Sequence, residues 1–304
     1  MILVVGATGL LGGEICRQLR SRGHAVRGLV REGSPGEREL RTLGIEIAHG
    51  DLRDAASLRS ACAGVASAVT TANAIVPRRS GDSLVRVDRD GTLALVEAAR
   101  EAGVQHFVYT SVGPSLSSRA PFVAFKRQVE NAVRGSGMAW TILQPSAFMQ
   151  IHLGPAVGWD LAAAKAQIFG SGTVQQTYID LRDVARFAVA ALEHEALRGT
   201  DMVLGGPEAM TPLDALRVCE QVTGRKFAVR RMPAAVMTLL ASGLRPFNPS
   251  FSSLLIIAHE GATRGDRIDM GPLLARMPEP VQLHSFRDYV EGAWAELQGS
   301  SRPA

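Results

Sequence analysis

Short apolar runs alternate with helical patterns through the first half of the chain. Six such runs lie at 2–5, 25–30, 45–48, 66–71, 107–110 and 140–143. Continuous apolar runs of this length are typical of strands buried on both faces of a parallel sheet. Strands that alternate with helices form right-handed βαβ units. The pattern therefore predicts an α/β fold with a doubly wound parallel sheet.

Helical periodicity between the runs marks the faces that pack on the sheet. Leu11, Ile15 and Leu19 recur every fourth residue, which makes one face of the first helix apolar. The same spacing predicts further helices over 91–102 and 122–134.

The alternation stops after Pro145 and resumes later. Glycine and proline punctuate residues 151–175, whereas Asp180 has the side chain of a helix N-cap and residues 202–204 fit a seventh strand. The predicted division is a Rossmann-type domain over 1–150 with 176–206 returning to it, and a smaller, mostly helical C-terminal lobe over 151–175 and 207–304.

The composition fits an ordinary globular protein. Of 304 residues, 46% are hydrophobic and 20% are charged, and the net charge is +4. Most basic residues are interleaved with acids. Two denser groups, Arg78-Arg79 and the basic residues within 225–231, have none of the aromatic interleaving that nucleic-acid binding needs. We therefore predict no nucleic-acid partner.

Cysteine and histidine usage argues against disulfides and metal. The three cysteines, Cys16, Cys62 and Cys219, are an odd number in apolar, helix-like surroundings, which favours buried free thiols in a reducing compartment. None of the seven histidines stands at ligand spacing with another histidine or with a cysteine. The sequence therefore predicts no metal site.

No membrane span or secretory signal is predicted. The apolar stretches 236–240 and 254–257 are separated by Arg245 and two prolines, and neither reaches the roughly 20 residues that a spanning helix requires. A strand is expected from Ile2, where a secretory signal would have its basic segment. We predict a cytosolic protein whose C-terminal apolar stretches form a lid or a pocket wall. These patterns leave monomer and homodimer equally open.

A glycine-rich loop joins the first strand to the first helix. It reads Gly6-Ala7-Thr8-Gly9-Leu10-Leu11-Gly12. Gly6 permits the turn, Gly9 permits close approach to a phosphate, and Gly12 lets helix and strand pack. A glycine motif alone is weak evidence, but here a strand precedes it and a periodic helix follows, as a dinucleotide-binding motif requires. We predict that a pyrophosphate binds at the positive end of this helix.

The end of the second strand indicates which dinucleotide binds. An acid there would bind the ribose hydroxyls and repel a 2′-phosphate. The chain instead has Arg31, 19 positions after Gly12, and Glu32 comes one residue too late to be that acid. A guanidinium can bind a phosphate through a forked pair of donors. The sequence therefore favours NADP(H), and the alternative is that Arg31 is an ordinary surface arginine.

Several segments recur in the order and spacing of a known family. They are the loop 6–12, Val30-Arg31, Gly50-Asp51-Leu52, the run 107–111, and Tyr178-Ile179-Asp180 with Asp183-Val184-Ala185. Together they resemble the NmrA-like atypical short-chain dehydrogenases/reductases, over residues 1–210 or so. The resemblance implies an NADP-binding first domain and a substrate-binding lobe.

The resemblance also implies a role for each matching position. It assigns the pyrophosphate to Gly6, Thr8, Gly9, Leu10, Leu11 and Gly12, the 2′-phosphate to Arg31, and the adenine to Asp51 and Leu52. It places Thr71, Ala72 and Asn73 under the adenosine and nicotinamide side of the cofactor. It frames the nicotinamide and its ribose with Thr110, Ser111, Lys126, Pro145 and Ser146.

The chain departs from the usual short-chain active site at two positions. Active short-chain reductases pair a tyrosine acid with a lysine four residues later, whereas here Phe122 precedes Lys126. Val112 stands where the family's carbonyl-orienting serine is expected. Lys126 remains the predicted catalytic residue, because it would bind the ribose and lend positive charge near a developing anion. The alternative is a solvated helix lysine.

Three side chains are candidates to replace the missing acid. Tyr109 and Tyr178 lie in strand-like apolar runs, where a packing role is commoner for tyrosine. His152 lies at the start of the expected substrate region, where a titrating imidazole would serve as an acid. Pocket-lining positions, for which plain core packing is the alternative, are predicted at Phe148, Met149, Trp159, Phe247 and Phe251.

The missing tyrosine leaves two functions open. The leading prediction is an NADPH-dependent reductase that delivers hydride to an apolar conjugated acceptor such as a quinone, enone, imine or benzylic centre. Such acceptors delocalise the developing charge and need less help from a placed acid. The alternative is a non-catalytic NADP(H)-binding redox sensor or scaffold, which a large exposed apolar patch on the C-terminal lobe would favour.

Overall fold

A central sheet of seven parallel strands organises the structure, a computed structural model that describes residues 1–300. Its strand order is β10-β6-β5-β4-β1-β2-β3. The strands are β1 (Ile2–Val5), β2 (Val26–Val30), β3 (Glu46–His49), β4 (Ser67–Thr70), β5 (His106–Thr110), β6 (Ala139–Pro145) and β10 (Thr200–Leu204). The doubly wound parallel sheet predicted from the sequence is confirmed, and its seventh strand pairs with β6.

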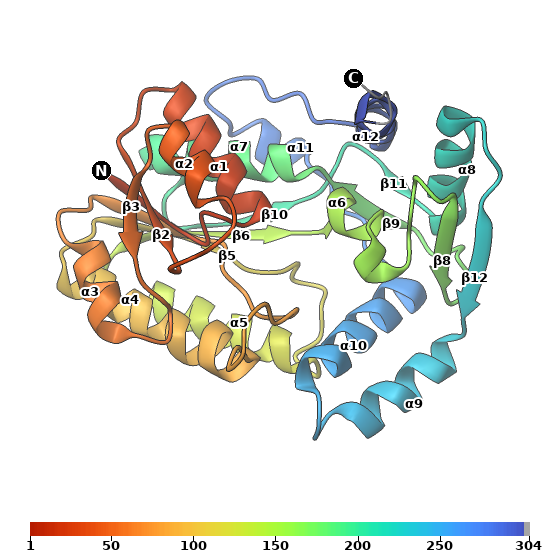
Figure 1. Cartoon of the computed structure of the whole chain (residues 1–304), viewed down its shortest axis with the longest axis horizontal. Helices are drawn as coiled ribbons and strands as arrows, with labels where there is room; N and C mark the ends of the chain where they lie inside the picture. Colours follow the sequence, from red (N-terminus) through yellow and green to blue (C-terminus); the bar gives the residue numbers. More distant parts are fainter. Residues whose placement is uncertain (301–304) are drawn as a thin grey trace.

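Helices cover both faces of the sheet (Figure 1). One face carries α1 (Leu10–Ser21), α2 (Glu37–Thr42) and α7 (Leu181–Glu193). The other carries α3 (Ala55–Cys62), α4 (Thr92–Glu101) and α5 (Pro121–Arg134). Ile15 and Leu19 of α1 are fully buried, on the face that the periodicity predicted. Asp180 caps α7, as predicted, by accepting a hydrogen bond from the backbone N of Arg182 at 2.8 Å.

One helix begins earlier than predicted. A π-helix, η1 (Leu84–Gly91), runs directly into α4, so helical structure starts at Leu84 rather than at Gly91. Leu84, Val87 and Asp88 are buried along one side of η1. Because an acid occupies one of these inward positions, the apolar spacing does not reveal the helix.

Two small sheets lie beyond the central one (Figure 1). A three-stranded sheet has the order β11-β9-β7, and β12 pairs in parallel with β8. Their strands are β7 (Ala147–Phe148), β8 (Lys165–Phe169), β9 (Gln176–Ile179), β11 (Ala209–Met210) and β12 (Ala228–Met232). The sequence predicted a mostly helical region after Pro207 and missed β12, because most of its side chains are exposed and give no apolar alternation.

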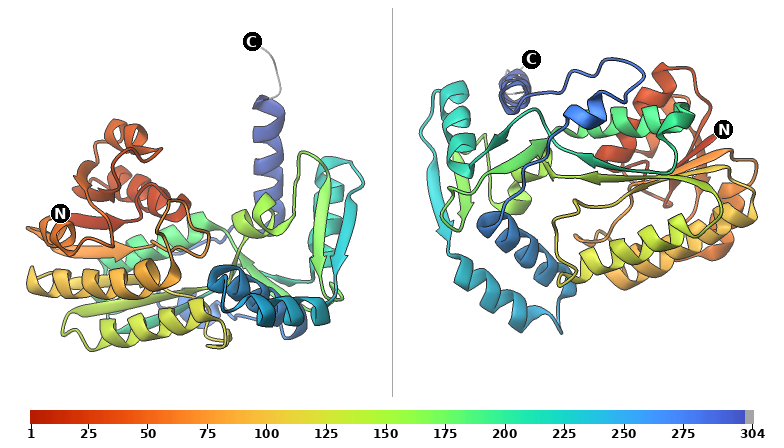
Figure 2. Two further views of the ribbon diagram at one scale, coloured as in Figure 1. Left: turned by 60° about the horizontal axis from the view of Figure 1, so that its bottom comes forward. Right: turned by 180° about the vertical axis from the view of Figure 1, so that it is seen from behind.

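The remaining helices follow the small sheets. They are α6 (Met149–His152), α8 (Pro212–Thr223), α9 (Ala234–Leu244), α10 (Pro249–Thr263), α11 (Gly271–Leu274) and α12 (Phe286–Ser300), with short 3₁₀ turns η2 (Pro155–Val157) and η3 (Glu195–Leu197). α9 and α10 pack against each other, and α12 packs along α8 (Figure 2). Within residues 1–300, no helix is long and apolar enough to cross a membrane.

The segment after α10 returns to the central sheet. Met270 is buried in the core cluster on the α1 and α7 face, and Leu274 packs against that cluster. Asp183 of α7 accepts hydrogen bonds at 2.8 Å from the backbone N and from Nδ1 of His284. The assignment of residues 207–304 to a separate lobe remains a prediction.

Candidate functional site

The glycine loop has a shape that only glycine permits. Gly6 has a φ of +85°, in the left-handed region, and its carbonyl oxygen accepts a hydrogen bond from Gly9 N at 2.9 Å. A Cβ on Gly12 would lie 2.1 Å from that oxygen. Gly9 is the N-cap of α1 and supplies no side-chain hydrogen bond. The loop therefore brings bare backbone to a helix N-terminus, which is the arrangement that binds an anion.

Thr71 and Ala72 lie directly behind this loop. A Cβ on Gly6 would lie 2.8 Å from Thr71 Oγ1 and 3.0 Å from Ala72 N. Thr71 N donates to Val5 O at 3.0 Å, which ties the end of β4 to the end of β1. The strand order reverses between β1 and β4, and ligands of open α/β sheets bind in the crevice at such a point. The structure thus brings together two segments that the sequence selected separately.

The other loop residues reach different surroundings. Leu10 is largely exposed at the start of α1, whereas Leu11 packs against the core. A Cβ on Gly36 would lie 3.7 Å from Thr8 Cβ, so Thr8 faces the turn that follows β2. Asn73, two residues beyond Thr71, accepts a hydrogen bond from the backbone of its own turn at 3.4 Å.

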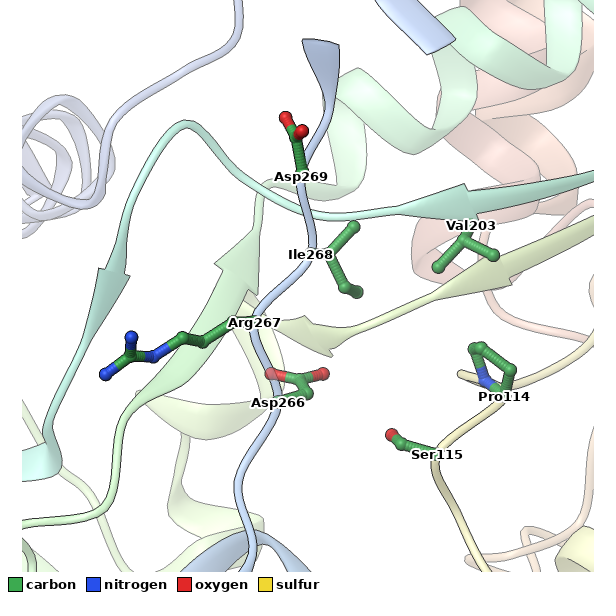
Figure 3. Close-up of a pocket in the computed structure, with 7 residues that line it drawn as sticks. All are labelled: Pro114, Ser115, Val203, Asp266, Arg267, Ile268 and Asp269. Carbon is green, nitrogen blue, oxygen red and sulfur yellow. The ribbon is translucent and has the colours of Figure 1, made fainter. Parts of the chain in front are cut away.

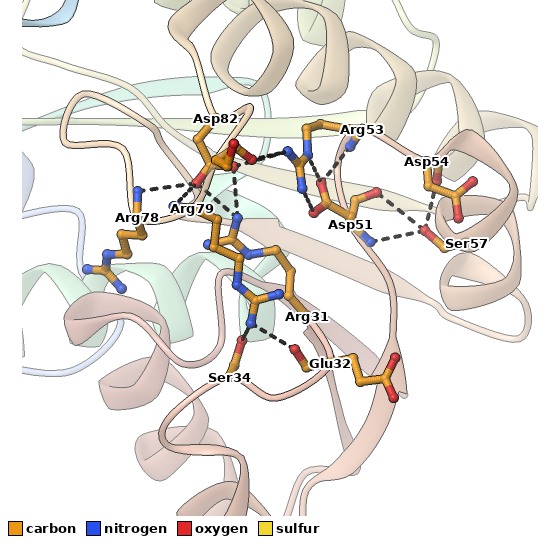
Figure 4. Close-up of polar contacts among 11 residues, drawn as sticks. Arg31, Glu32, Ser34, Asp51, Arg53, Asp54, Ser57, Arg78, Arg79 and Asp82 are labelled. Carbon is orange, nitrogen blue, oxygen red and sulfur yellow. Dashed lines mark hydrogen bonds and ion pairs between the residues drawn. The ribbon is translucent and has the colours of Figure 1, made fainter.

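Arg31, at the end of β2, is held by an acid from a different turn. Its Nη1 donates to both carboxylate oxygens of Asp82, at 2.9 and 3.0 Å (Figure 4). Asp82 also accepts from the backbone N of Arg78 at 3.3 Å and of Arg79 at 3.0 Å. Burial alone would raise the pKa of Asp82, but the hydrogen bond from Arg31 and those from the backbone donors outweigh it and lower this pKa. Arg31 is therefore not an unpaired surface arginine.

Asp51, predicted to bind the adenine, is engaged by Arg53. The Asp51 carboxylate accepts from Arg53 Nε at 2.9 Å and from Arg53 Nη2 at 2.7 Å. Burial opposes the resulting shift, but these bonds lower the pKa of Asp51. Leu52 is buried in the core cluster below α3 and α4. Asp51 and Arg31 lie in the same group of charged side chains at the carboxyl edge of the sheet (Figure 4).

Lys126 is buried on α5 at the end of β5, which excludes the solvated alternative. Its side chain is 4% exposed, and Nζ donates to Thr110 O at 3.0 Å. Nζ also lies 4.9 Å from the ring centroid of Tyr109 and 5.3 Å from that of Phe122. Burial lowers the pKa of Lys126, and the carboxylates of Asp88 and Glu130 oppose that shift.

These two buried carboxylates were not selected from the sequence. Asp88 Oδ2 accepts from Ala74 N at 2.9 Å, and Asp88 Oδ1 has no hydrogen-bond partner within residues 1–300. Burial raises the pKa of Asp88 to about 6, against the opposing charge of Lys126. Glu130 accepts from Ser111 Oγ and from Arg127. Glu130 occupies an inward position on the apolar face of α5, and that pattern would have identified it, whereas Asp88 lies in η1, which the apolar spacing does not reveal.

The remaining residues predicted beside the nicotinamide lie at the ends of β5 and β6. Thr110 and Ser111 are buried, and Ser111 N donates to Leu143 O at 2.7 Å. Pro145 is the last residue of β6, and Ser146 N donates to Leu204 O at 2.8 Å. The hydroxyls of Thr110 and Ser146 are buried without a hydrogen-bond partner among residues 1–300. Such groups suit a ligand that supplies polar partners.

The candidates for a replacement acid are poorly placed to give a proton. Tyr109 is buried, and its hydroxyl has no partner within the described chain. Tyr178 packs between the rings of His152 and Phe286, with centroid distances of 5.7 and 5.4 Å. Burial raises the pKa of both tyrosines and lowers that of His152, whose Nδ1 lies 3.1 Å from Phe148 O.

The predicted pocket-lining side chains lie in three different places. Met149 and Trp159 are buried in the apolar cluster of the small sheets, and Trp159 Nε1 donates to Gln167 O at 2.8 Å. Phe148 is half-buried against the main core. Phe247 and Phe251, on the α9–α10 side, are exposed, at 85% and 45%.

A pocket of about 330 Å³ lies between residues 114–115, Val203 of β10 and residues 266–269 (Figure 3). Its lining consists of Pro114, Ser115, Val203, Asp266, Arg267, Ile268 and Asp269. None of these residues was predicted to bind cofactor or substrate. Three of them are charged, although most of the surface that lines the pocket is apolar. Within residues 1–300, no group of His, Cys, Asp and Glu side chains is arranged to hold a metal ion.

The parallel sheet and the glycine loop at its strand reversal define a Rossmann-type α/β protein. The sequence profile of the NmrA-like family matches residues 1–256. The chain is 34% identical to the NAD(P)H azoreductase of Xenophilus azovorans over 226 residues, which cover 74% of each protein. The chain therefore belongs to the NmrA-like family.

Other relatives carry different names. The chain is 28% identical over 304 residues to the photosystem II assembly factor Ycf39 of Synechocystis, covering 95% of this chain and 89% of that protein. Its fold matches the NADPH complex of quinone oxidoreductase QOR2 from Escherichia coli with a TM-score of 0.74 and 20% identity, covering 97% of this chain and all of that one. The chain is thus similar both to reductases and to an assembly factor.

Proposed function

We propose that the protein is an NADPH-dependent reductase that transfers hydride to an apolar conjugated acceptor. The observation that carries the proposal is one continuous edge of the sheet. It begins at the uncapped N-terminus of α1, passes Arg31 at the end of β2, and reaches the buried Lys126 at the end of β5. These are the places where a dinucleotide bound across the strand reversal needs donors.

The residues present fit NADP(H). The backbone of Gly6, Gly9 and Gly12 would hold the pyrophosphate, because any side chain at Gly12 would fill the space where the backbone of the loop comes close. Arg31 would bind the 2′-phosphate. The buried hydroxyls of Thr110 and Ser146 would bind the nicotinamide end. The bound cofactor supplies the hydride.

Lys126 provides positive charge at a fixed position near the acceptor. Its hydrogen bond to Thr110 O and its two aromatic neighbours hold Nζ in place, so the ammonium needs no reorganisation as negative charge develops. Phe122 and Val112 provide no proton where short-chain reductases have tyrosine and serine. This favours an acceptor that spreads the charge, such as a quinone, enone, imine or benzylic centre.

Calorimetric titration with NADPH and NADH tests the cofactor assignment. We expect tighter binding of NADPH, and Arg31→Ala should remove most of the difference by weakening NADPH alone. Arg38→Ala, which removes an exposed arginine from the neighbouring helix α2, is the matched control and should leave the difference intact. Equal binding of both cofactors by the unaltered protein would contradict the assignment. A stopped-flow screen of quinones and conjugated carbonyls then tests for NADPH oxidation.

The alternative of a non-catalytic NADP(H)-binding regulator or scaffold is favoured by one observation. Leu239 and Phe247, on α9 and just after it, are 74% and 85% exposed, and Phe251 adds to the same apolar region. Exposed apolar patches mark contact sites for other molecules. Binding of NADPH without oxidation by any acceptor in the screen would support this function over the reductase. The same proposal includes a cytosolic location and a small apolar substrate.

A further inference from the structure

Three turns at the carboxyl edge of the sheet are joined by charged side chains. Arg31 follows β2, Asp51 and Arg53 follow β3, and Asp82 lies in the segment after β4 (Figure 4). Asp82 is the common partner, because Arg31 contacts both of its oxygens and Arg53 Nη1 lies 3.6 Å from Oδ1. Its side chain is only 4% exposed.

Arg79 makes a further contact between two of these turns. Arg79 Nη2 donates to Glu32 O at 2.8 Å and to Ser34 Oγ at 3.2 Å, so the segment after β4 is fastened to the turn after β2. The Glu32 carboxylate points away from the group (Figure 4). The adjacent pair Arg78-Arg79, which no nucleic-acid motif explains, therefore belongs to this edge of the sheet.

The group has an excess of positive charge. Arg31, Arg53 and Arg79 contribute three guanidinium groups and Asp51 and Asp82 contribute two carboxylates, which leaves one positive charge, because the guanidinium of Arg78 points away from the group. A phosphate monoester carries a charge of about −1.5 to −2 at neutral pH. The unbalanced positive charge of the group therefore favours binding of an anion such as a phosphate monoester. Asp82 already occupies Nη1 of Arg31, one of the donors that such a phosphate would use.

We propose that the Asp82 carboxylate occupies the place of the 2′-phosphate in the free protein. When the cofactor binds, its 2′-phosphate displaces Asp82 from Arg31, and Arg79 becomes a further phosphate ligand. This inference rests on the proposed binding of NADPH. The carboxylate keeps Arg31 extended from the end of β2 in the free protein, so the guanidinium is preoriented. The same carboxylate competes with the phosphate and limits affinity for it. Asp82 therefore sets how strongly the protein prefers NADPH over NADH.

Two nucleotides that differ only in the 2′-phosphate isolate this subsite. Adenosine 2′,5′-bisphosphate and 5′-AMP are titrated by calorimetry into the full chain and its variants. Asp82→Asn keeps an acceptor for the backbone N–H groups but removes the charge, and we expect it to tighten bisphosphate binding about tenfold with 5′-AMP unchanged within about twofold. Arg79→Gln should weaken bisphosphate binding about tenfold and also leave 5′-AMP unchanged.

Asp54→Asn is the matched control for a general change of charge. Asp54 lies in the neighbouring turn, caps α3 through Ala56 N at 3.0 Å, and contacts none of the arginines drawn in Figure 4. Asparagine caps a helix as well as aspartate does. An equal gain in Asp54→Asn and Asp82→Asn would overturn the proposal, because it would reflect overall charge alone.

The remaining outcomes separate this inference from the proposed function. If the unaltered protein prefers the bisphosphate and Asp82→Asn does not tighten it, the inference fails and the cofactor assignment stands. If Asp82→Asn weakens the binding of both nucleotides, the role of Asp82 is to stabilise its own turn, and the inference fails. If neither the nucleotides nor NADPH bind to the unaltered protein, the proposed function fails first.

Discussion

Nζ of Lys126 donates to the carbonyl oxygen of Thr110 at 3.0 Å, across the junction of α5 and β5. This bond places a buried cation at the carboxyl end of a central strand, beside Thr110 and Ser111. Phe122 stands four residues before this lysine, where the short-chain reductase pattern has a tyrosine. On the proposed function, this lysine would supply the electrostatic part of a reductase site.

Replacing Lys126 with Met tests that electrostatic role. The variant keeps an unbranched side chain of similar length and loses the charge, so we expect the rate of NADPH oxidation to fall about 100-fold in single-turnover stopped flow. Binding of 5′-AMP, which does not reach this residue, should stay unchanged. The control is Lys165→Met, since Lys165 is exposed on β8. A rate equal to that of the unaltered protein would rule out a catalytic role for Lys126.

Gly12→Ala should abolish cofactor binding. Its Cβ would lie 2.1 Å from Gly6 O, so α1 and the loop must separate, and we expect NADPH affinity to fall at least about 100-fold. In the adjacent Gly13→Ala the nearest contact is 3.4 Å, to Ala7 O. That variant should bind NADPH normally and gain about 0.5–1 kcal/mol in the free energy of unfolding. Calorimetry and urea unfolding measure both effects, and similar losses in the two variants would contradict this account of the loop.

Asp88→Asn should change how stability depends on pH. Burial raises the pKa of Asp88 from 3.8 to about 6, so the folded protein holds this proton more tightly than the unfolded chain does. The contribution is therefore fully present below the unfolded pKa and is lost as pH rises through about 6. Asparagine cannot titrate and lacks this loss.

Urea unfolding at pH 4 and pH 6.5 measures the difference. The free energy of unfolding of Asp88→Asn minus that of the unaltered protein should be about 2 kcal/mol larger at pH 6.5 than at pH 4. Asp90→Asn, at an exposed position of the same helix η1, serves as the control and should show no such gain. Parallel pH profiles for Asp88→Asn and the unaltered protein would show that Asp88 titrates normally.

The three cysteines should be unreactive in the folded protein. Cys16, Cys62 and Cys219 are buried and free, and burial raises their pKa values to about 12, 11 and 12. Thiol reagents attack the thiolate, which is scarce at such pKa values and shielded from solvent. We expect Ellman's reagent at pH 8 to detect no thiol in the native state and three in urea. Rapid reaction of one native thiol would show that its helix opens readily.

Sequence patterns alone determined the sheet and the loop. Buried parallel strands are continuous apolar runs, and the glycine loop follows from one short segment, so both depend on neighbours along the chain. The position of Arg31 was accessible for the same reason, because it stands at the end of a strand, whereas Lys126 was identified through the family resemblance. The α1 periodicity and the Asp180 cap are equally local.

Only the tertiary structure decided which charges meet. The pairing of Arg31 with Asp82 joins turns that are 51 residues apart, and the influence of Asp88 on Lys126 joins η1 to α5. The strand β12 exists because β8 supplies its hydrogen bonds, and its own side chains give no strand pattern. Such contacts depend on how separate βαβ units pack, and the energy of a buried charge depends on partners that local spacing cannot specify.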